Sequence, residues 1–566
     1  MSNIFLFLFI TATQAQLLTD KSTFTKEDSL RGSLNENRNW WNVLRYNITV
    51  KPDFEKKEIE GKVVLSAVAV KKGKIMQLDL QQPLIVDSII RKGNFFTIKN
   101  GVRISYPIHQ TYQFTQKDDI VLVELNETKR KGDRIDFHIY YHGKPKEAKM
   151  PPWDGGWIWE KDNNGNPFVS VAVQGLGASA WLPCKDHQSD EPDNGASLTI
   201  IVPDTLIAVS NGVLNSVKQI SNSQFHSYTW QVKNPINNYC IIPYIGKYTN
   251  FSDTLHGEKG ILNINYWVLD YNVEKAKEQF KQVKPMLRAF EYWFGAYPFY
   301  EDGYKIVEAP HLGMEHQSAI AYGNQYNNGY LGKDRSGETG WGLKWDFIIV
   351  HESGHEWFGN NITAKDVADI WVHEAFTTYS ETLFTEYYYG KQAANEYNYG
   401  QRKNILNDKP IIGPYDVNKE GSSDMYDKGS NMINSIRLAI NDDKKFRNIL
   451  RGLNKTFYHK TVTTKEIEDY IIKQAGFNFQ KVFDQYLRTT QIPMLTYKIS
   501  DDGKQMILQY QNCVQGFNLP LWLNSNTLKI VFDENSKSQT IAFNENTIAE
   551  IMNLEKLYYI QVKHIK

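Results

Sequence analysis

The stretch from His351 to Glu374 constrains this chain more than any other part of the sequence. His351 and His355 stand four positions apart, so on a helix both imidazoles project from one face. At that spacing, both nitrogens can reach a single zinc ion at about 2.0–2.1 Å. Glu352 follows the first histidine directly, where its carboxylate can take a proton from a zinc-bound water. The pentad therefore predicts a helix that carries a catalytic metal site.

The residues around this pentad agree with a buried helix that is followed by a second one. Residues 345–350 are largely apolar, as the start of a buried helix should be, and Gly359 offers a stop signal. A second helical pattern over residues 370–389 makes Glu374 a candidate third ligand. Two histidines, one carboxylate and an open water position make a catalytic zinc site rather than a closed structural one. The alternative is two hydrogen-bonded histidines and a solvated glutamate on an ordinary helix.

The length and composition describe an ordinary globular protein of several domains. At 566 residues the chain is too long for one compact domain, and three or four domains are the natural expectation. The formal net charge is zero, so no basic stripe is available for phosphate backbones and no nucleic acid is expected as a partner. Cys184, Cys240 and Cys513 show no metal-ligand spacing, and three cysteines allow at most one disulfide.

The N-terminus carries the pattern of a secretory signal peptide. Residues 4–10 read I-F-L-F-L-F-I, and small residues follow up to Ala15, after which cleavage is expected. The residues before the apolar core include no lysine or arginine, which departs from the usual signal. No later stretch approaches the ~20 apolar residues that a membrane-spanning helix requires. We therefore expect residues 1–15 to be removed and the protein to be exported, periplasmic or secreted, with no stable membrane span.

The hydrophobic pattern predicts a multidomain α+β fold with three folded parts. Alternating apolar residues and turn signals over residues 38–266 predict an N-terminal antiparallel β domain of sandwich or saddle type. Helical periodicity dominates residues 267–490. Pro285 is expected to kink the first helix or end its first part, and Thr463 starts a capping box. Strand patterns return over residues 491–566 and predict a small C-terminal β-sandwich.

Three stretches outside the pentad carry further candidate residues. Glu315 precedes the pentad, and a carboxylate near a zinc site can hold the ammonium group of a peptide N-terminus. Tyr426 precedes a helical pattern, and its hydroxyl can donate a hydrogen bond to a developing oxyanion. Gln174 lies in a loop of the expected β domain. Read singly, these residues are a surface glutamate, a core or surface tyrosine, and a loop glutamine.

Taken together, these motifs resemble the zinc aminopeptidases of the aminopeptidase N and leukotriene hydrolase family, which are gluzincins. That family carries H-E-x-x-H, eighteen residues and then a glutamate, and the interval from His355 to Glu374 matches this count. The run W-V-H-E-A-F-T-T-Y, which starts at Trp371, is close to the family's W-L-N-E-G-F-A. The family's G-x-M-E-N aligns with residues 312–316, and its Y-x-K-G aligns with residues 426–429.

The resemblance implies a zinc-dependent aminopeptidase whose substrates are peptides with a free N-terminus. It implies a β-saddle domain, a thermolysin-like, mainly helical catalytic domain and a small β-sandwich. It also implies a short form without the C-terminal helical domain of many members. One zinc ion is expected as cofactor. The implied site residues are, for zinc, His351, His355 and Glu374; for catalysis, Glu352 and Tyr426; for substrate binding, Glu315, Gly313, Met314, His316 and Gln174; and, beside a zinc-binding histidine, Glu381.

Two departures from the family pattern and two rival functions stay open. Leu312 replaces the motif's glycine and His316 its asparagine, so a bulkier and potentially charged side chain could alter the pocket for the first substrate residue or weaken amine capture at low pH. Glu381, seven residues after Glu374, could equally lie on a solvated helix face. The rivals are a zinc endopeptidase of thermolysin type and a non-catalytic peptide-binding homologue. An epoxide hydrolase side activity also stays open.

Overall fold

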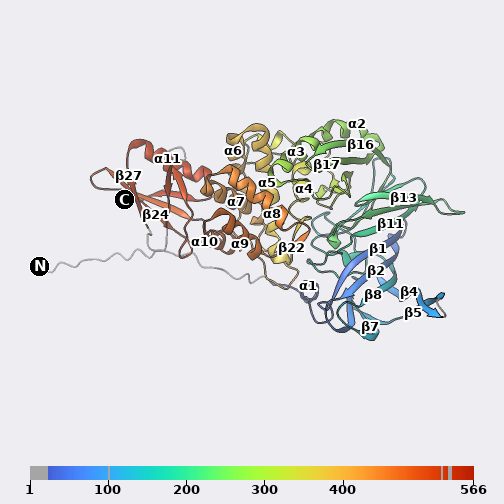
Figure 1. The fold of residues 1–566 in the computed structure, drawn as a ribbon. Coiled ribbons are helices and arrows are strands. Elements are labelled where there is room, and N and C mark those ends of the chain that lie inside the picture. The colour runs from blue at the N-terminus through green and yellow to red at the C-terminus, as the bar shows by residue number, and fades with distance from the viewer. Residues whose placement is uncertain (1–22, 100–101, 524–526, 533–537, 566) are drawn as a thin grey trace.

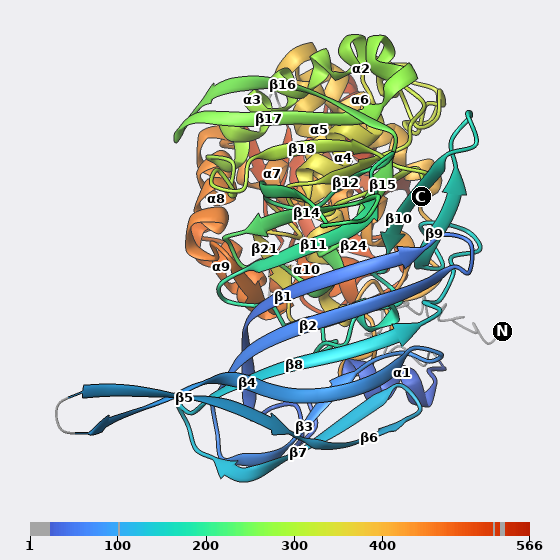
Figure 2. The ribbon, with the colours of Figure 1, turned by 90° about the vertical axis from the view of Figure 1, so that its right-hand side faces the viewer.

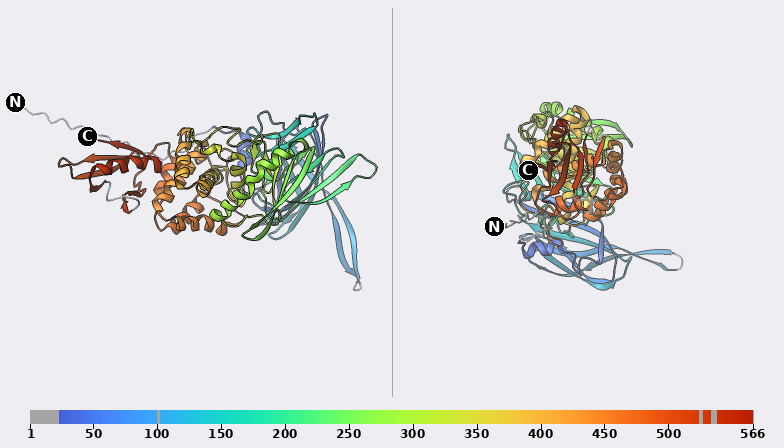
Figure 3. Two further views of the ribbon diagram at one scale, coloured as in Figure 1. Left: turned by 90° about the horizontal axis from the view of Figure 1, so that it is seen from above. Right: turned by 90° about the vertical axis from the view of Figure 1, so that its left-hand side faces the viewer.

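The computed structural model of the chain describes residues 23–99, 102–523, 527–532 and 538–565. These residues fold into three units that follow one another along an elongated molecule (Figure 1, Figure 3): a β domain, a domain rich in helices, and a small C-terminal unit. The expected signal segment, residues 1–15, lies outside the described residues. Within the described ranges, no helix is both long and apolar enough to cross a membrane.

The β domain is built on an eight-stranded sheet of order β13-β14-β11-β1-β2-β8-β4-β5, whose strands cross the front of Figure 2. Alternate residues of β1 and β8 are buried, because one face of the sheet packs on the core. β1 runs parallel to β11 and the other neighbours are antiparallel, so the sheet is mixed. Its strands are β1 (Trp41–Asp53), β2 (Glu58–Ala69), β4 (Ile85–Lys99), β5 (Val102–Thr111), β8 (Arg134–Gly143), β11 (Ala196–Pro203), β13 (Val213–Gln219) and β14 (Phe225–Val232).

Two smaller sheets complete the β domain, with the orders β12-β15-β10-β9 and β3-β7-β6. Apolar residues of the three sheets share one core, which includes Trp41, Trp157 and Trp181. The short helix α1 (Lys26–Gly32) lies where the β domain meets the next unit (Figure 1). The strands of the smaller sheets are β3 (Gly73–Asp79), β6 (Gln113–Lys117), β7 (Ile120–Lys129), β9 (Gly156–Lys161), β10 (Pro167–Ala172), β12 (Ile207–Val209) and β15 (Tyr244–Gly246).

The second unit, which we call the helical domain, starts with a five-stranded sheet of order β16-β17-β18-β20-β19. This sheet corrects the boundary that the sequence analysis places between residues 266 and 267, because that point falls inside β17. Tyr266 pairs with Ile306 and Trp267 with Val307 of β18, so the helical domain already begins at β16. Buried and more exposed residues alternate in β16 and β17 as in the strands before them. Only the pairing with β18 shows that these two strands belong to the helical domain. The strands are β16 (Tyr248–Gly257), β17 (Gly260–Leu269), β18 (Tyr304–Glu308), β19 (Gly313–Met314) and β20 (Ile320–Tyr322).

Helices form most of the helical domain. The first helix ends before Pro285: α2 stops at Gln279 and a 3-10 turn follows. Pro285 then occupies the first turn of α3, where no backbone N–H is needed. Thr463 and Glu466 form the predicted capping box of α9. The helices are α2 (Val273–Gln279), α3 (Val283–Phe294), α4 (Phe347–Gly354), α5 (Trp371–Tyr389), α6 (Lys391–Gln401), α7 (Asp427–Ile440), α8 (Asp443–Thr456), α9 (Thr464–Ala475) and α10 (Gln480–Arg488), with the short strands β21 (Ile362–Ala364) and β22 (Lys460–Val462).

The C-terminal unit has a four-stranded sheet of order β27-β24-β23-β28, a two-stranded ribbon and one helix. The helix, α11 (Glu545–Leu557), is not predicted by the sequence pattern, so this unit is not all β. Ile551 and Leu554 of α11 are buried in the core that continues from the helical domain. Cys184, Cys240 and Cys513 are all buried and free. The strands are β23 (Met494–Ile499), β24 (Gln505–Gln511), β25 (Leu521–Leu523), β26 (Leu528–Ile530), β27 (Ser538–Ala542) and β28 (Gln561–His564).

Candidate active site

The helix α4 presents the two histidines of the pentad from the centre of the helical domain. Asp346 caps its N-terminus by accepting hydrogen bonds from the backbone N–H groups of Ile348 and Ile349. The helix ends at Gly354, which is earlier than the stop expected at Gly359. His355 is the C-cap residue and keeps helical backbone angles, φ −63° and ψ −20°. The two imidazoles therefore still lie on one face, with ring centres 5.0 Å apart.

Glu374, in the first turn of α5, completes a group of three possible metal ligands. Its Oε2 lies 3.8 Å from His351 Nε2 and 3.4 Å from His355 Nε2. The three ligand atoms lie within 4.8 Å of one another, and all three residues are buried. No residue in the described part of the chain donates a hydrogen bond to Glu374 Oε2, and a buried carboxylate oxygen is costly without a partner. Two imidazoles and one carboxylate with an unpartnered oxygen fit a single zinc ion that keeps one coordination position open.

Hydrogen bonds on the far side of each imidazole fix which nitrogen faces Glu374. His351 Nδ1 donates to Glu381 Oε1 at 2.7 Å. Glu381 Oε2 in turn accepts from the Tyr397 hydroxyl at 2.6 Å and from Gln401 Nε2 at 2.9 Å. His355 Nδ1 lies 3.0 Å from the carbonyl oxygen of Phe358. These contacts hold both Nε2 atoms toward the proposed metal position, and such outer contacts set ring orientation and metal affinity.

Glu352 lies between this group and the strand β19. A Cβ on Gly313 would lie 2.8 Å from Glu352 Oε1 and 2.9 Å from Ile348 Cδ1, so this position needs a glycine. The glycine of the strand thus makes room for the carboxylate beside the pentad. Burial raises the pKa of Glu352 to about 8, against the lowering effect of His355. A carboxylate in this place can exchange a proton with a water or an amine between β19 and α4.

Glu315 follows β19 and is buried at the junction of the β domain and the helical domain. Gln174 Nε2 donates to Glu315 Oε1 at 2.6 Å, and the Tyr239 hydroxyl donates to the same oxygen at 3.0 Å. Carboxylate and imidazole atoms of Glu315, Glu352 and His355 lie within 4.8 Å of one another. The structure therefore brings the predicted Glu315 and Gln174 together, and places both beside the metal group.

Met314 and His316, on either side of Glu315, are buried as well. Met314 lies in the core of the β domain. His316 Nδ1 lies 2.8 Å from the Tyr244 hydroxyl, which donates to the carbonyl oxygen of Ala319 at 2.7 Å. Burial holds the pKa of His316 well below its usual range. Burial therefore disfavours the charged form of His316, which the sequence left open as a possibility at low pH.

Tyr426 lies directly before α7, and its ring centre is 6.1 Å from that of His351. The motif around it has a packing reason. A Cβ on Gly429 would lie 2.6 Å from Ala375 Cβ, so the glycine lets α7 approach α5 one residue after Glu374. Lys428 Nζ donates to the carbonyl oxygen of Thr489 at 2.9 Å. Burial raises the pKa of Tyr426 well above its ordinary value, so the hydroxyl keeps its proton and remains a donor.

Some residues of the site were not found by sequence reasoning. Tyr239 lies in a 3-10 turn of the β domain, Asn238–Cys240, and its contact with Glu315 spans 76 positions. Tyr397 and Gln401 lie on α6, and they reach Glu381 because α6 packs against α5. No spacing or motif marks these residues, since their role depends on which elements pack together.

The fold joins a β domain, a helical domain and a small C-terminal unit, and the site in its helical domain offers two histidines and one glutamate that could hold one metal ion. The comparison with known proteins gives the family. Residues 278–486 match the peptidase family M1 domain, and residues 42–240 match the peptidase M1 N-terminal domain. The chain belongs to peptidase family M1.

Similar proteins agree with this assignment. A probable aminopeptidase 2 from Sulfurisphaera tokodaii is 20% identical over 449 residues, which are 75% of this chain and 54% of that protein. Leukotriene A-4 hydrolase from Xenopus laevis is 22% identical over 453 residues, which are 76% of this chain and 68% of that protein. The chain therefore spans little more than half of the first relative. An M1 zinc metallopeptidase from Deinococcus radiodurans, solved as a mutant with a Tyr-Ser-Ala substrate, has a TM-score of 0.63 at 20% identity and covers 80% of this chain and 96% of its own.

Proposed function

We propose that this protein is a zinc-dependent aminopeptidase, which removes residues from the free N-termini of peptides. The observation that carries the proposal is the position of Glu315, a buried carboxylate whose oxygen lies within 4.8 Å of both the Glu352 carboxylate and His355. Within one amino acid, the amine nitrogen and the carbonyl carbon are about 2.5 Å apart. An ammonium group bound at Glu315 would thus leave room for a single residue before the reacting carbonyl.

The three ligand residues supply the metal part of this activity. His351, His355 and Glu374 would hold one zinc ion. When bound, zinc polarises the scissile carbonyl and makes a water acidic enough to attack at neutral pH. Glu352 would take a proton from that water and pass it to the leaving amine, because its carboxylate lies between β19 and the pentad helix.

The remaining residues would position the substrate. Glu315 would pair with the substrate ammonium, and Gln174 would orient the carboxylate by its hydrogen bond to Oε1. The Tyr426 hydroxyl, kept protonated by burial, would donate to the oxyanion that develops on the scissile carbonyl. Gly313 would leave the space that both Glu352 and a bound peptide need beside β19.

We further propose that the protein works outside the cytoplasm, as an exported periplasmic or secreted enzyme. The support is the apolar segment at residues 4–10 and the small residues up to Ala15. N-terminal sequencing of the protein from culture fractions tests this. An uncleaved protein recovered with the cytosol would contradict it.

One panel of substrates tests the enzymatic function. Aminoacyl fluorogenic amides, and the same amides with an acetylated N-terminus, are incubated with the protein with and without a chelator. We expect hydrolysis of the free amides, loss of activity with the chelator and recovery with zinc. Faster cleavage of N-acetylated peptides at internal bonds would instead indicate an endopeptidase, and no turnover of any peptide would indicate a binding protein.

A further inference from the structure

We propose that Arg31 is a positioning residue for the amine-binding part of this site. It acts through the loop of residues 173–177, which carries Gln174, and it ties that loop to the helical domain. The proposal rests on the proposed function, because Gln174 is taken to orient the carboxylate that receives the substrate ammonium. Arg31 belongs to α1, a helix that the sequence pattern does not predict.

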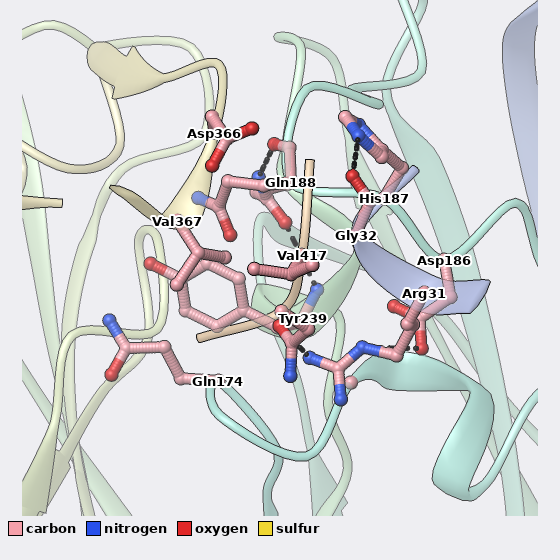
Figure 4. A pocket seen from close by; sticks show the side chains of 13 residues that line it. Arg31, Gly32, Gln174, Asp186, His187, Gln188, Tyr239, Asp366, Val367 and Val417 are labelled. Carbon is pink, nitrogen blue, oxygen red and sulfur yellow. Dashed lines mark hydrogen bonds and ion pairs between the residues drawn. The ribbon is translucent and has the colours of Figure 1, made fainter. Parts of the chain in front are cut away.

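The guanidinium of Arg31 bridges the two domains. One terminal nitrogen, Nη2, donates to the carbonyl oxygen of Gly175 at 2.7 Å and to Asn418 Oδ1 at 2.7 Å. The other, Nη1, donates to the carbonyl oxygen of Leu176. Nε lies 3.6 Å from Asp186 Oδ2. Figure 4 shows Arg31 reaching from α1 toward Asp186 and the Val417 segment, on one side of a pocket that Gln174 and Tyr239 also line.

Other contacts fasten α1 to the helical domain at the same point. Asn418 donates its backbone N–H to the carbonyl oxygen of Asp28 at 2.9 Å, and its side-chain nitrogen to Gly175 at 3.0 Å. A Cβ on Gly32 would lie 2.2 Å from the carbonyl carbon of Val417. The backbones of α1 and of residues 417–418 are therefore in direct contact, and only glycine permits that approach.

The loop needs such a support because it has no strand or helix of its own. It closes on itself through the backbone N–H of Gly177, which donates to the carbonyl oxygen of Val173 at 2.6 Å. That closure leaves the carbonyls of Gly175 and Leu176 free for side chains. Gln81 Nε2 binds one of them, Leu176, at 2.8 Å. Arg31 binds both, and the planar fork of an arginine suits two neighbouring acceptors.

The loss of Arg31 should affect binding of the substrate amine and not the reaction at the scissile bond. Gln174 is the residue before Gly175, and its hydrogen bond to Glu315 is 2.6 Å long. If the two carbonyls lose Arg31, the loop can move and the Glu315 carboxylate loses its fixed orientation. The proposed metal ligands and Glu352 lie on or next to α4 and α5, and His351 is held by Glu381 of α5 rather than by α1. Arg31 should therefore affect KM for free N-termini and leave kcat almost unchanged.

A double-mutant cycle tests the coupling. Arg31→Ala should raise KM for an aminoacyl anilide about 2- to 10-fold and by no more than Gln174→Ala does, because it acts through Gln174, with kcat within about twofold. In the Gln174→Ala background, Arg31→Ala should have no further effect on KM. Lys26→Ala is the matched control on the same helix. The Lys26 ammonium is exposed and makes a long ion pair, 3.8 Å, with the exposed Asp118. An equal KM increase in both backgrounds would overturn the proposal.

A readout without activity separates this proposal from the proposed function. Hydrogen–deuterium exchange of residues 173–177 should be faster in Arg31→Ala and unchanged in Lys26→Ala. Gly32→Ala is a second variant that pushes α1 away from Val417 and keeps the guanidinium, and it should raise exchange and KM in the same direction. Unchanged exchange in both Arg31→Ala and Gly32→Ala would refute the role of Arg31, even if the enzyme proves active. Faster exchange without any aminopeptidase activity would refute the proposed function and, with it, the catalytic consequence drawn for Arg31.

Discussion

The two parts of the proposed site, one for the metal and one for the substrate amine, are built in different ways. The metal part consists of side chains from α4 and α5, held by neighbours from the same domain such as Tyr397 of α6. The amine-binding part brings Glu315 of the helical domain against Gln174 and Tyr239 of the β domain, across 141 and 76 positions of chain. One part depends on local helix geometry and the other on how two domains meet.

This difference predicts which kinetic quantity each substitution should change. Substitutions in the metal part should alter turnover or metal binding, and they should leave recognition of the N-terminus unchanged. Substitutions in the amine-binding part should alter KM and the discrimination between free and blocked N-termini. The expected effects below run from the largest to the smallest, and each tests whether the two parts are separable.

Glu352→Gln should produce the largest loss. The amide keeps the shape of the side chain but cannot accept a proton, so kcat should fall about 10²- to 10⁴-fold. Metal analysis should show the same zinc content as the wild type, because Glu352 is not among the three ligands His351, His355 and Glu374. Turnover close to that of the wild type would show that another residue is the base.

Glu315→Ala should weaken the use of free N-termini about 10- to 100-fold in kcat/KM, since a hydrogen-bonded ion pair to the substrate is lost. The same variant should treat N-acetylated peptides as the wild type does. Gln174 and Tyr239 would remain as donors to an empty position. Equal losses on free and acetylated substrates would argue that Glu315 supports the fold and not the ammonium.

Glu381→Ala should lower zinc affinity about 10- to 100-fold, because His351 would lose the acceptor that orients its ring. Competition with a chromogenic chelator measures this directly. At saturating zinc, KM for an aminoacyl anilide should stay near the wild-type value, since the amine-binding part is untouched. Glu396→Ala is a suitable control, because Glu396 is an exposed residue that accepts from Trp341 Nε1.

Among these four substitutions, Gln174→Ala should have the smallest effect, a rise in KM of about 2- to 10-fold, because one hydrogen bond to Glu315 is lost and that of Tyr239 remains. Zinc content and kcat should not change. Gln219→Ala, at an exposed position of the same domain, serves as the control. A loss of zinc in Gln174→Ala would mean that the two parts of the site are not separable.

Much of the fold could be predicted because its signals are local. The helix over α5, the capping box at Thr463 and the strand β24 follow from periodicity and caps within short windows. The boundary at residue 266 could not be placed, because β16 and β17 alternate like the strands of the β domain and differ only in their partner, β18. The helix α11 was not predicted for a related reason, because its buried residues pack into the core of the neighbouring domain.

For the site, the sequence alone determined the donor set. The four-residue spacing of His351 and His355 predicts that both imidazoles share one face, because helix geometry converts spacing into direction. Glu374 became a candidate ligand through the second helical pattern and the family resemblance, and the packing of α5 against α4 brings it to the histidines. Only the tertiary structure decided what surrounds that chemistry. Contacts such as those of Tyr239 with Glu315 and of Arg31 with Gly175 join residues far apart in the chain. They exist because two domains pack together, and no local pattern in the sequence encodes that packing.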